Sequence, residues 1–365
     1  MMSGTFKTDV LISGTGAFAG RIALDIASTA PEPVNVVIAG RNRDRLDWLR
    51  TAGNARASMF SRPATFSTME VDLLEEGAAE RMILEARPKI VVQAASVQTS
   101  SVISDTGNAW TALVAEGGLS ATAIFQALLT SRVGKAISEH SPRSALINCC
   151  FPDVVNAMIQ ALGHDVLCGT GNVAILSNVF AGARGADAPE RLRVLAHYQN
   201  LAAWRLPRER RAGATPPRVF LDGREVADVF EAFASIKLTA EPAIEVSGAS
   251  GVTLICAYAA GRPWAGHVPG PGGLPGGYPV RLEAGKLHLD LPEGLAREEA
   301  ISWNHAFEAK NGLVLDGQRA HFTGRLKAAF ERVGFAHAGG FEIGRLEEVY
   351  RDLALLRDAL SRQPA

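Results

Sequence analysis

A glycine-rich turn near the N-terminus limits the possible folds more than any other feature of the sequence. The run Asp9 to Ser13 (DVLIS) has the apolar, β-branched pattern of a strand, and the turn Gly14 to Gly20 (GTGAFAG) leads from it into a helical pattern. Val34 to Ala39 (VNVVIA) then predicts a second strand. Strand, helix and strand at this spacing form one βαβ unit, so the sequence predicts a parallel sheet covered by helices.

The alternation continues to about residue 150. Strands are predicted at Phe66 to Val71, Ile90 to Ala95 and Ala145 to Cys149, and helices at Glu75 to Ala86 and Leu119 to Ile137. The fold class is therefore α/β, with residues 1–150 forming an N-terminal Rossmann domain, a doubly wound parallel sheet that binds a dinucleotide.

Beyond residue 150 the pattern changes, and residues 151–365 are predicted to form a mixed α+β domain for substrate, catalysis and oligomerisation. Strand-like runs lie at Val166 to Cys168, Val219 to Leu221 and Val252 to Tyr258. The Gly- and Pro-rich segment His267 to Tyr278 is either a connector or a shaped binding loop. From Glu298 onward the chain reads as mostly helical.

The last helical segment, Leu346 to Leu360, is strongly amphipathic and can pack on the body or on a second subunit. We expect a homo-oligomer, either a dimer or a tetramer.

Composition excludes several classes of protein. The formal net charge of -1 gives no general attraction to nucleic acid or to an anionic membrane, and the one basic cluster, Arg205 to Arg211, reads as a solvated loop. No apolar run approaches the roughly 18 residues of a transmembrane helix. The four cysteines show no C-x-x-C spacing, which indicates reduced thiols. These observations predict a soluble cytoplasmic protein whose partner is a small-molecule substrate.

The turn itself predicts the dinucleotide site. Gly14 allows the tight turn, Gly16 lets the backbone approach a pyrophosphate, and the small residues that follow permit close packing of helix on strand. Backbone N–H groups at the helix N-terminus then bind the phosphate oxygens. The predicted contacts in this turn are Gly14, Thr15, Gly16, Ala17, Phe18 and Ala19.

The end of the second strand bears on the choice of cofactor. A carboxylate there would bind the ribose 2′-hydroxyl of NAD, whereas arginine accommodates the 2′-phosphate of NADP. This sequence has Ala39-Gly40-Arg41, so NADP(H) is favoured, with NAD(H) as the alternative. Arg41 could instead stack on adenine or face solvent. Fold geometry also predicts Asp72 on the adenine side, with Ala95 and Ser96 near the nicotinamide ribose.

Residues 150–200 carry a resemblance to a known family. The chain has Phe151-Pro152-Asp153, then Cys168-Gly169-Thr170-Gly171-Asn172, and then Ala196-His197-Tyr198. In order and spacing this run resembles the lactate and malate dehydrogenases, with their Asn-Pro-x-Asp, Gly-x-Gly strand and catalytic histidine. The resemblance implies a nicotinamide-dependent oxidoreductase in which His197 transfers the proton and Asp153 orients its ring. A local alternative for Asp153 is a helix cap.

The chain departs from that family at two substrate-binding positions. The family's substrate arginine falls near Asn178, and its mobile-loop arginine is replaced by the uncharged run Val97 to Ser101. Arg184, Arg191 or Arg193 could substitute. Without a guanidinium fork a 2-keto acid loses its bidentate anchor, so a larger or less anionic carbonyl or imine substrate is expected.

Three other interpretations stay open. NAD-dependent glycosidases share the fold and use a cysteine and a histidine as metal ligands, for which Cys168 and His197 are the candidates. The saccharopine and opine dehydrogenases have a similar Ala-Gly-Arg after the second strand, and this resemblance covers about the first 100 residues. A protein that senses NADP without catalysis would need neither mechanism. The favoured reading uses no metal.

Overall fold

The expected parallel sheet forms the centre of the molecule. The structure, a computed structural model, describes residues 6–103, 105–185, 191–239, 241 and 243–365. Six parallel strands lie in the order β3-β2-β1-β4-β5-β6. Their bounds are β1 (Thr8–Ser13), β2 (Val34–Gly40), β3 (Ala64–Glu70), β4 (Pro88–Gln93), β5 (Ala145–Asn148) and β6 (Cys168–Gly169). The strand order reverses between β1 and β4, and in such sheets ligands bind at the carboxyl ends of the strands beside this reversal.

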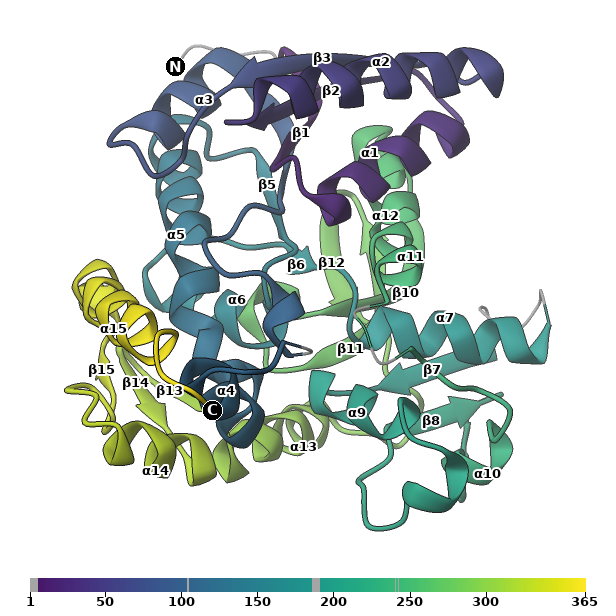
Figure 1. Ribbon diagram of the computed structural model, residues 1–365. Helices are drawn as coiled ribbons and strands as arrows, with labels where there is room; N and C mark the ends of the chain where they lie inside the picture. The colour runs from purple at the N-terminus through teal and green to yellow at the C-terminus, as the bar shows by residue number, and fades with distance from the viewer. Residues whose placement is uncertain (1–5, 104, 186–190, 240, 242) are drawn as a thin grey trace.

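Helices cover both faces of this sheet (Figure 1). On one face Val10 and Ile12 of β1 share a core with Ile22 and Ile26 of α1, and α12 joins them. On the other face Leu11 packs in a core with α3 and α5. The helices that follow the large sheet's strands are α1 (Ala17–Thr29), α2 (Arg43–Met59), α3 (Ala78–Ala86), α4 (Ala109–Gly117), α5 (Ala123–His140), α6 (Pro152–Ala161) and α7 (Val173–Arg184).

Helices α2 and α4 have no counterpart in the sequence prediction. Helix α2 is mostly polar and buries only Leu46, Leu49, Gly53 and Ala57, so its apolar stripe is too narrow to stand out. Helix α4 is short and almost wholly apolar, with little helical periodicity. The long helix predicted from Leu119 begins instead as a 3₁₀ turn, Leu119–Thr122, before α5.

The second half of the chain adds three small antiparallel sheets, as a mixed α+β region requires. Their strands are β7 (Leu192–Leu195), β8 (Arg218–Leu221), β9 (Arg224–Glu225), β10 (Trp264–Pro269), β11 (Gly277–Glu283), β12 (Lys286–Leu289), β13 (Leu313–Asp316), β14 (Arg319–Phe322) and β15 (Phe341–Glu342). The accompanying helices are α9 (Leu201–Trp204), α10 (Val229–Ala232), α11 (Ile244–Ser247), α12 (Val252–Ala259), α13 (Arg297–Lys310), α14 (Gly324–Arg332) and α15 (Leu346–Leu360).

One local prediction is wrong. The run Val252 to Tyr258 is helix α12, because a short apolar run buried on most sides has no periodicity that separates strand from helix. The segment His267 to Tyr278, predicted as a connector or a shaped binding loop, has its ends in β10 and β11, and the glycines between them form the turn of that hairpin. The region after Glu298 is mostly helical, as predicted, and β13, β14 and β15 form a small sheet within it.

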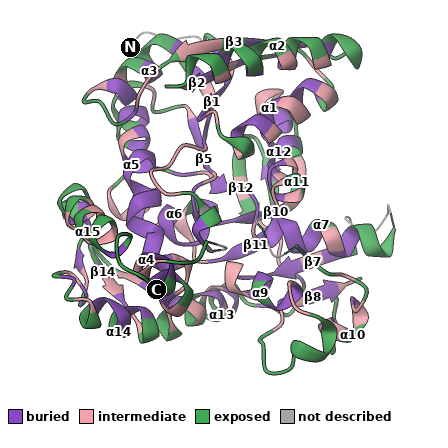
Figure 2. Cartoon of the chain, viewed as in Figure 1, coloured by how far each residue is buried: buried purple, intermediate pink, exposed green. Residues whose placement is uncertain are grey.

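The division at residue 150 stays a prediction, and the two parts share structure. Strand β6 belongs to the large sheet although it lies beyond residue 150. Helix α15 packs through Leu346, Val349 and Leu353 into the core that contains α5, and it lies beside α5 in Figure 1. Its outer face is exposed in Figure 2, so the apolar stripe covers the body of the same chain. Among the described helices none combines the length and apolarity needed to cross a membrane.

Two leucines of α15 test this packing. Leu353 is 0% exposed, whereas Leu355 on the same helix is 72% exposed. We expect Leu353→Ala to lower the free energy of unfolding by about 2–5 kcal/mol, because it removes buried methyl groups and leaves a cavity. Leu355→Ala is the control and should change it by less than about 0.5 kcal/mol. Urea unfolding measures both, and equal losses would contradict the arrangement.

Candidate functional site

The glycine turn is held between two neighbouring strands. The N–H of Gly14 donates to Ala39 O at the end of β2 (2.8 Å), and Ala94 N after β4 donates to Ser13 O (2.8 Å). Gly14 has a φ of +126°, which strongly favours glycine, and a Cβ there would lie 3.1 Å from the carbonyl carbon of Ala94. The turn is therefore fixed at the switch point between β1 and β4.

The space beside Gly16, the second glycine of the turn, is open. Gly16 is the N-cap of α1 and is exposed, and a Cβ built on it would have no atom within 4 Å. No side chain of the described residues caps the helix, so the N–H groups of its first turn, at Ala17, Phe18 and Ala19, have no side-chain acceptor there. Free N–H groups and the positive end of the helix dipole suit an anion. The turn fits the pyrophosphate of a dinucleotide.

The predicted adenosine-side residues lie together. The Arg41 side chain is 70% exposed, and its guanidinium lies 3.7 Å from the carboxylate of Asp72, which follows β3. Asp72 also accepts a hydrogen bond from Leu74 N (3.0 Å). Both residues line a cavity of about 300 Å³ between β3 and α3. Their roles stay predictions.

The residues predicted near the nicotinamide follow β4. Ala95 O accepts hydrogen bonds from Gln93 Nε2 (2.8 Å) and Cys150 Sγ (3.3 Å), so the ends of β4 and β5 are tied together. Ser96 is half-buried, and its hydroxyl donates to Gln98 O (2.8 Å). These contacts place Ala95 and Ser96 at the carboxyl end of the sheet, on the far side of the switch point from Arg41.

Asp153 lies in the first turn of α6 and is 1% exposed. One carboxylate oxygen accepts from Tyr198 N (3.0 Å) and the other from the side-chain amide of Asn172. Burial raises the pKa of Asp153 to about 6. The N-cap of α6 is Phe151, and the carboxylate of Asp153 joins α6 to the segments before α7 and around Tyr198.

His197 is fully buried and its ring does not bond to Asp153. Its Nδ1 accepts from Gln199 N (3.3 Å), so the neutral ring carries its proton on Nε2, which lies 3.4 Å from an oxygen of Glu308. The ring stacks on Phe307 at 4.9 Å between centroids, and burial lowers its pKa to about 3. Asp153 instead accepts a hydrogen bond from the backbone N–H of Tyr198, the residue after His197. The catalytic roles of the two residues stay a prediction.

Glu308 of α13 is the central residue of this cluster and was missed by sequence reasoning. Although only 3% exposed, its carboxylate accepts from Ser120 Oγ (2.8 Å), Leu313 N (2.7 Å) and Gln199 Nε2 (3.1 Å). Ser120 Oγ also lies 3.1 Å from the Tyr198 hydroxyl. Burial raises the pKa of Glu308 to about 7. No sequence pattern indicates this cluster, because its members come from residues 120, 197–199 and 308.

The candidate substrate residues do not gather at this cluster. Asn178 is exposed on α7, and its amide donates to Ala174 O of its own helix (2.7 Å). Arg184 lies over the Phe233 ring (5.0 Å), while the other two candidates pair with carboxylates: Arg191 with Asp222 and Arg193 with Asp290. These arginines are engaged elsewhere. The buried carboxylates of Asp153 and Glu308 thus have no arginine contact among the described residues.

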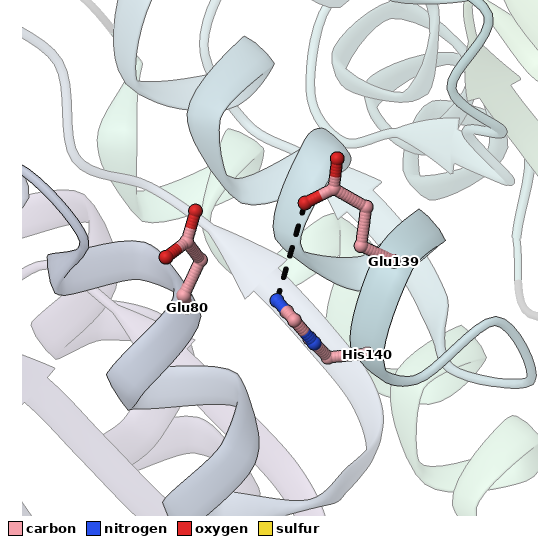
Figure 3. A group of neighbouring side chains, drawn as sticks. All are labelled: Glu80, Glu139 and His140. Carbon is pink, nitrogen blue, oxygen red and sulfur yellow. Dashed lines mark ion pairs between the residues drawn. The ribbon is translucent and has the colours of Figure 1, made fainter.

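One group of side chains has the spacing of metal ligands. Figure 3 shows Glu80 of α3 with Glu139 and His140 at the end of α5, whose ligand atoms all lie within 4.8 Å of one another. Glu139 and His140 are exposed. Neither Cys168 nor His197 belongs to such a group within the described residues. Cys168 is fully buried, and burial raises the pKa of its thiol.

The fold is that of the lactate and malate dehydrogenases, which confirms the resemblance at the level of the fold. Cryptosporidium parvum malate dehydrogenase is similar over 82% of this chain and 96% of its own, with 14% identity and a TM-score of 0.53. Lactate dehydrogenase from the same organism, complexed with lactic acid and NAD, is similar over 99% and 100% at 14% identity and a TM-score of 0.52.

The Eimeria maxima lactate dehydrogenase, with NADH and oxamate, is similar over 84% of this chain and 93% of its own at 15% identity, with a TM-score of 0.52. Neither a protein-family model nor a curated protein sequence matches the chain. At these identities the likeness concerns the fold alone.

The buried carboxyl of Glu308 predicts a pH-dependent stability. Because the pKa rises from 4.5 to about 7 on folding, the folded state binds the proton more tightly. This stabilisation is complete below pH 4.5 and is lost as the pH rises through 7. Relative to Glu308→Gln, the wild-type protein should lose up to roughly 1.4 kcal/mol per pH unit across this window.

Chemical denaturation at a series of pH values measures the difference in unfolding free energy between wild type and Glu308→Gln. Asp153 and His197 are present in both proteins, so their titration cancels and the difference reports on Glu308. Glu298→Gln is the control, since Glu298 is exposed on the same helix. Parallel stability curves for wild type and Glu308→Gln would contradict the assignment.

Proposed function

We propose that this protein is a nicotinamide-dependent oxidoreductase that transfers a hydride between the dinucleotide and a small alcohol or carbonyl, or amine or imine, substrate. The observation that carries the proposal is the open space above Gly16, at the N-terminus of α1 and beside the switch point of the sheet. In a turn without a ligand, position 16 could hold a larger residue, because neither the backbone conformation nor a neighbouring atom requires glycine there. Similar solved structures hold NAD or NADH on the same fold.

The residues of this chain support binding of the cofactor in an extended form across the strand ends. The N–H groups of Gly16 to Ala19 face the pyrophosphate, Arg41 and Asp72 flank the adenosine side, and Ala95 and Ser96 flank the nicotinamide ribose. When bound, the nicotinamide supplies the site that accepts or donates the hydride.

NADP(H) is the favoured form within this proposal, and NAD(H) is the alternative. Strand β2 ends at Gly40 and is followed by Arg41 and Asn42, so no carboxylate stands where NAD-binding sites use one to bind the ribose 2′-hydroxyl. The carboxylate of Asp72 is 3.7 Å from the Arg41 guanidinium. The positive charge at this strand end supports the phosphorylated ribose.

For proton transfer we keep His197 as the candidate and add Glu308 as its carboxylate neighbour. The Nε2 of the neutral ring lies 3.4 Å from a Glu308 oxygen without a hydrogen bond between them, and the Glu308 pKa of about 7 suits proton exchange near neutral pH. Asp153 then acts on the backbone, since it holds Tyr198 N and thereby the chain beside His197. The carboxylates in this cluster disfavour an anionic substrate and favour a neutral or cationic one.

Two rival functions make different demands. A metal-dependent hydrolase of the glycosidase type would need ligands around Cys168 and His197, but the His197 ring nitrogens face Gln199 and Glu308. A sensor that binds NADP without catalysis would keep the turn and would tolerate loss of His197.

The open space at Gly16 predicts a selective loss of cofactor binding. Gly16→Val should fold normally, because φ is −69° and no atom meets its Cβ, but its side chain would occupy the space that a pyrophosphate needs. We expect binding of NADPH and NADH to weaken by at least about tenfold, as measured by fluorescence titration.

The control is Gly182→Val, since Gly182 of α7 also has no atom within 4 Å of its Cβ. It should leave affinity unchanged. Undiminished affinity in Gly16→Val would remove the proposed site, as would a wild-type protein that binds neither dinucleotide.

His197 tests the catalytic proposal. We expect His197→Gln to retain NADPH binding and to reduce turnover by about 100-fold or more, because general acid–base groups contribute on that scale. Consumption of NADPH with a panel of small ketones, aldehydes and imines measures turnover.

The matched control is His267→Gln, since His267 is also buried, has a pKa lowered to about 3 by burial, and accepts a hydrogen bond from Val194 N. If both variants turn over at the wild-type rate, His197 has no catalytic role. Intact NADPH binding without turnover on the panel by the wild-type protein would support the sensor.

A further inference from the structure

Three arginines alternate with other residues just after β2, and their charges are not equally compensated. Arg41 pairs with Asp72 (3.7 Å), and Arg43 pairs with Glu70 at the end of β3. Arg45 forms no ion pair with any residue in the described ranges. It is therefore the arginine of this group whose positive charge has no nearby carboxylate partner.

Helix geometry directs Arg45 toward the glycine turn. The side chain of Asn42 caps α2 and accepts from Arg45 N (2.9 Å), which places Arg45 in the first turn of the helix. Side chains on a helix lean toward its N-terminus, and here that end lies at the carboxyl edge of the sheet. Arg45 is half-buried, unlike the exposed Arg41 and Arg43.

The guanidinium of Arg45 contacts the turn itself. Its Nε donates to Thr15 O (3.2 Å), and a Cβ on Gly20 would lie 3.2 Å from one of its terminal nitrogens. Those two terminal nitrogens form no hydrogen bond with a residue that the structure describes. A guanidinium held through Nε keeps its paired terminal N–H groups for a bidentate contact, which matches the geometry of a phosphate.

We propose that Arg45, held by the carbonyl of Thr15, binds the 2′-phosphate of a phosphorylated dinucleotide and sets the preference for that form. The position fits because Arg45 contacts the glycine turn through Thr15 O and lies in the helix that begins just after β2. In the proposed site the turn faces the pyrophosphate and the end of β2 faces the adenosine ribose. The N-terminus of α2 adds a favourable dipole for a dianion. Arg41 is then the secondary contact, since it is exposed and already pairs with Asp72. This inference rests on the proposed dinucleotide site.

Binding of four probes tests the proposal without a substrate: NADPH against NADH, and 2′-AMP against 5′-AMP, by isothermal titration calorimetry. We expect Arg45→Ala to weaken NADPH and 2′-AMP by about 10- to 100-fold, the scale of a hydrogen bond to a charged group. NADH and 5′-AMP should change by less than about threefold. Arg45→Lys should be intermediate, because it keeps the charge but loses the fork.

Arg43→Ala is the matched control. Arg43 lies two residues before Arg45 on the same helix, and its side chain pairs with Glu70. It should leave the ratio of NADPH to NADH affinity within about twofold of wild type. Thermal unfolding confirms that each variant is folded.

The outcomes separate the two proposals. If the wild-type protein binds no dinucleotide, the proposed function fails and this inference with it. If it binds dinucleotides but Arg45→Ala weakens NADPH and NADH equally, Arg45 only supports the turn and this inference alone fails. The same holds if Arg41→Ala, and not Arg45→Ala, removes the preference for the 2′-phosphate.

Discussion

The attachment of the glycine turn to the ends of β2 and β4 is the constraint on which the candidate site depends. Gly14 N reaches Ala39 O, and Ala94 N reaches Ser13 O, so β1 is held on both sides where the strand order reverses. This leaves Gly16 exposed at the start of α1 and leaves Ala95 and Ser96 across the same edge. The shape that suits a dinucleotide follows from backbone hydrogen bonds that any sequence could make, provided that position 14 is glycine.

A second constraint is the buried polar cluster around Glu308. Burying a carboxylate is costly unless donors surround it, and here Ser120, Gln199 and the Leu313 backbone do so. The cluster joins the segment before α5, the segment after β7 and the end of α13. It therefore fastens the second half of the chain to the segment before α5 and places His197 beside the Glu308 carboxylate.

The two halves of the molecule consequently differ in how their chemistry is arranged. The dinucleotide side uses backbone groups and arginines near one loop, whereas the other side uses side chains that meet only after folding. Arg45 illustrates the first kind, because one helical turn and one hydrogen bond to Thr15 set its position. Glu308 illustrates the second, since Ser120 lies 188 residues away along the chain.

The sequence alone determined the parallel sheet, the turn with its glycines and the amphipathic α15, because strand and helix periodicity and glycine's freedom at positive φ are local properties. It did not determine α12, the hairpin of β10 and β11, or the partner of the His197 ring. Short apolar runs carry no period that separates helix from strand, and contacts between distant segments leave no spacing to read. Only the tertiary structure decided that His197 faces Glu308 while Asp153 holds Tyr198, because burial and long-range packing select these partners.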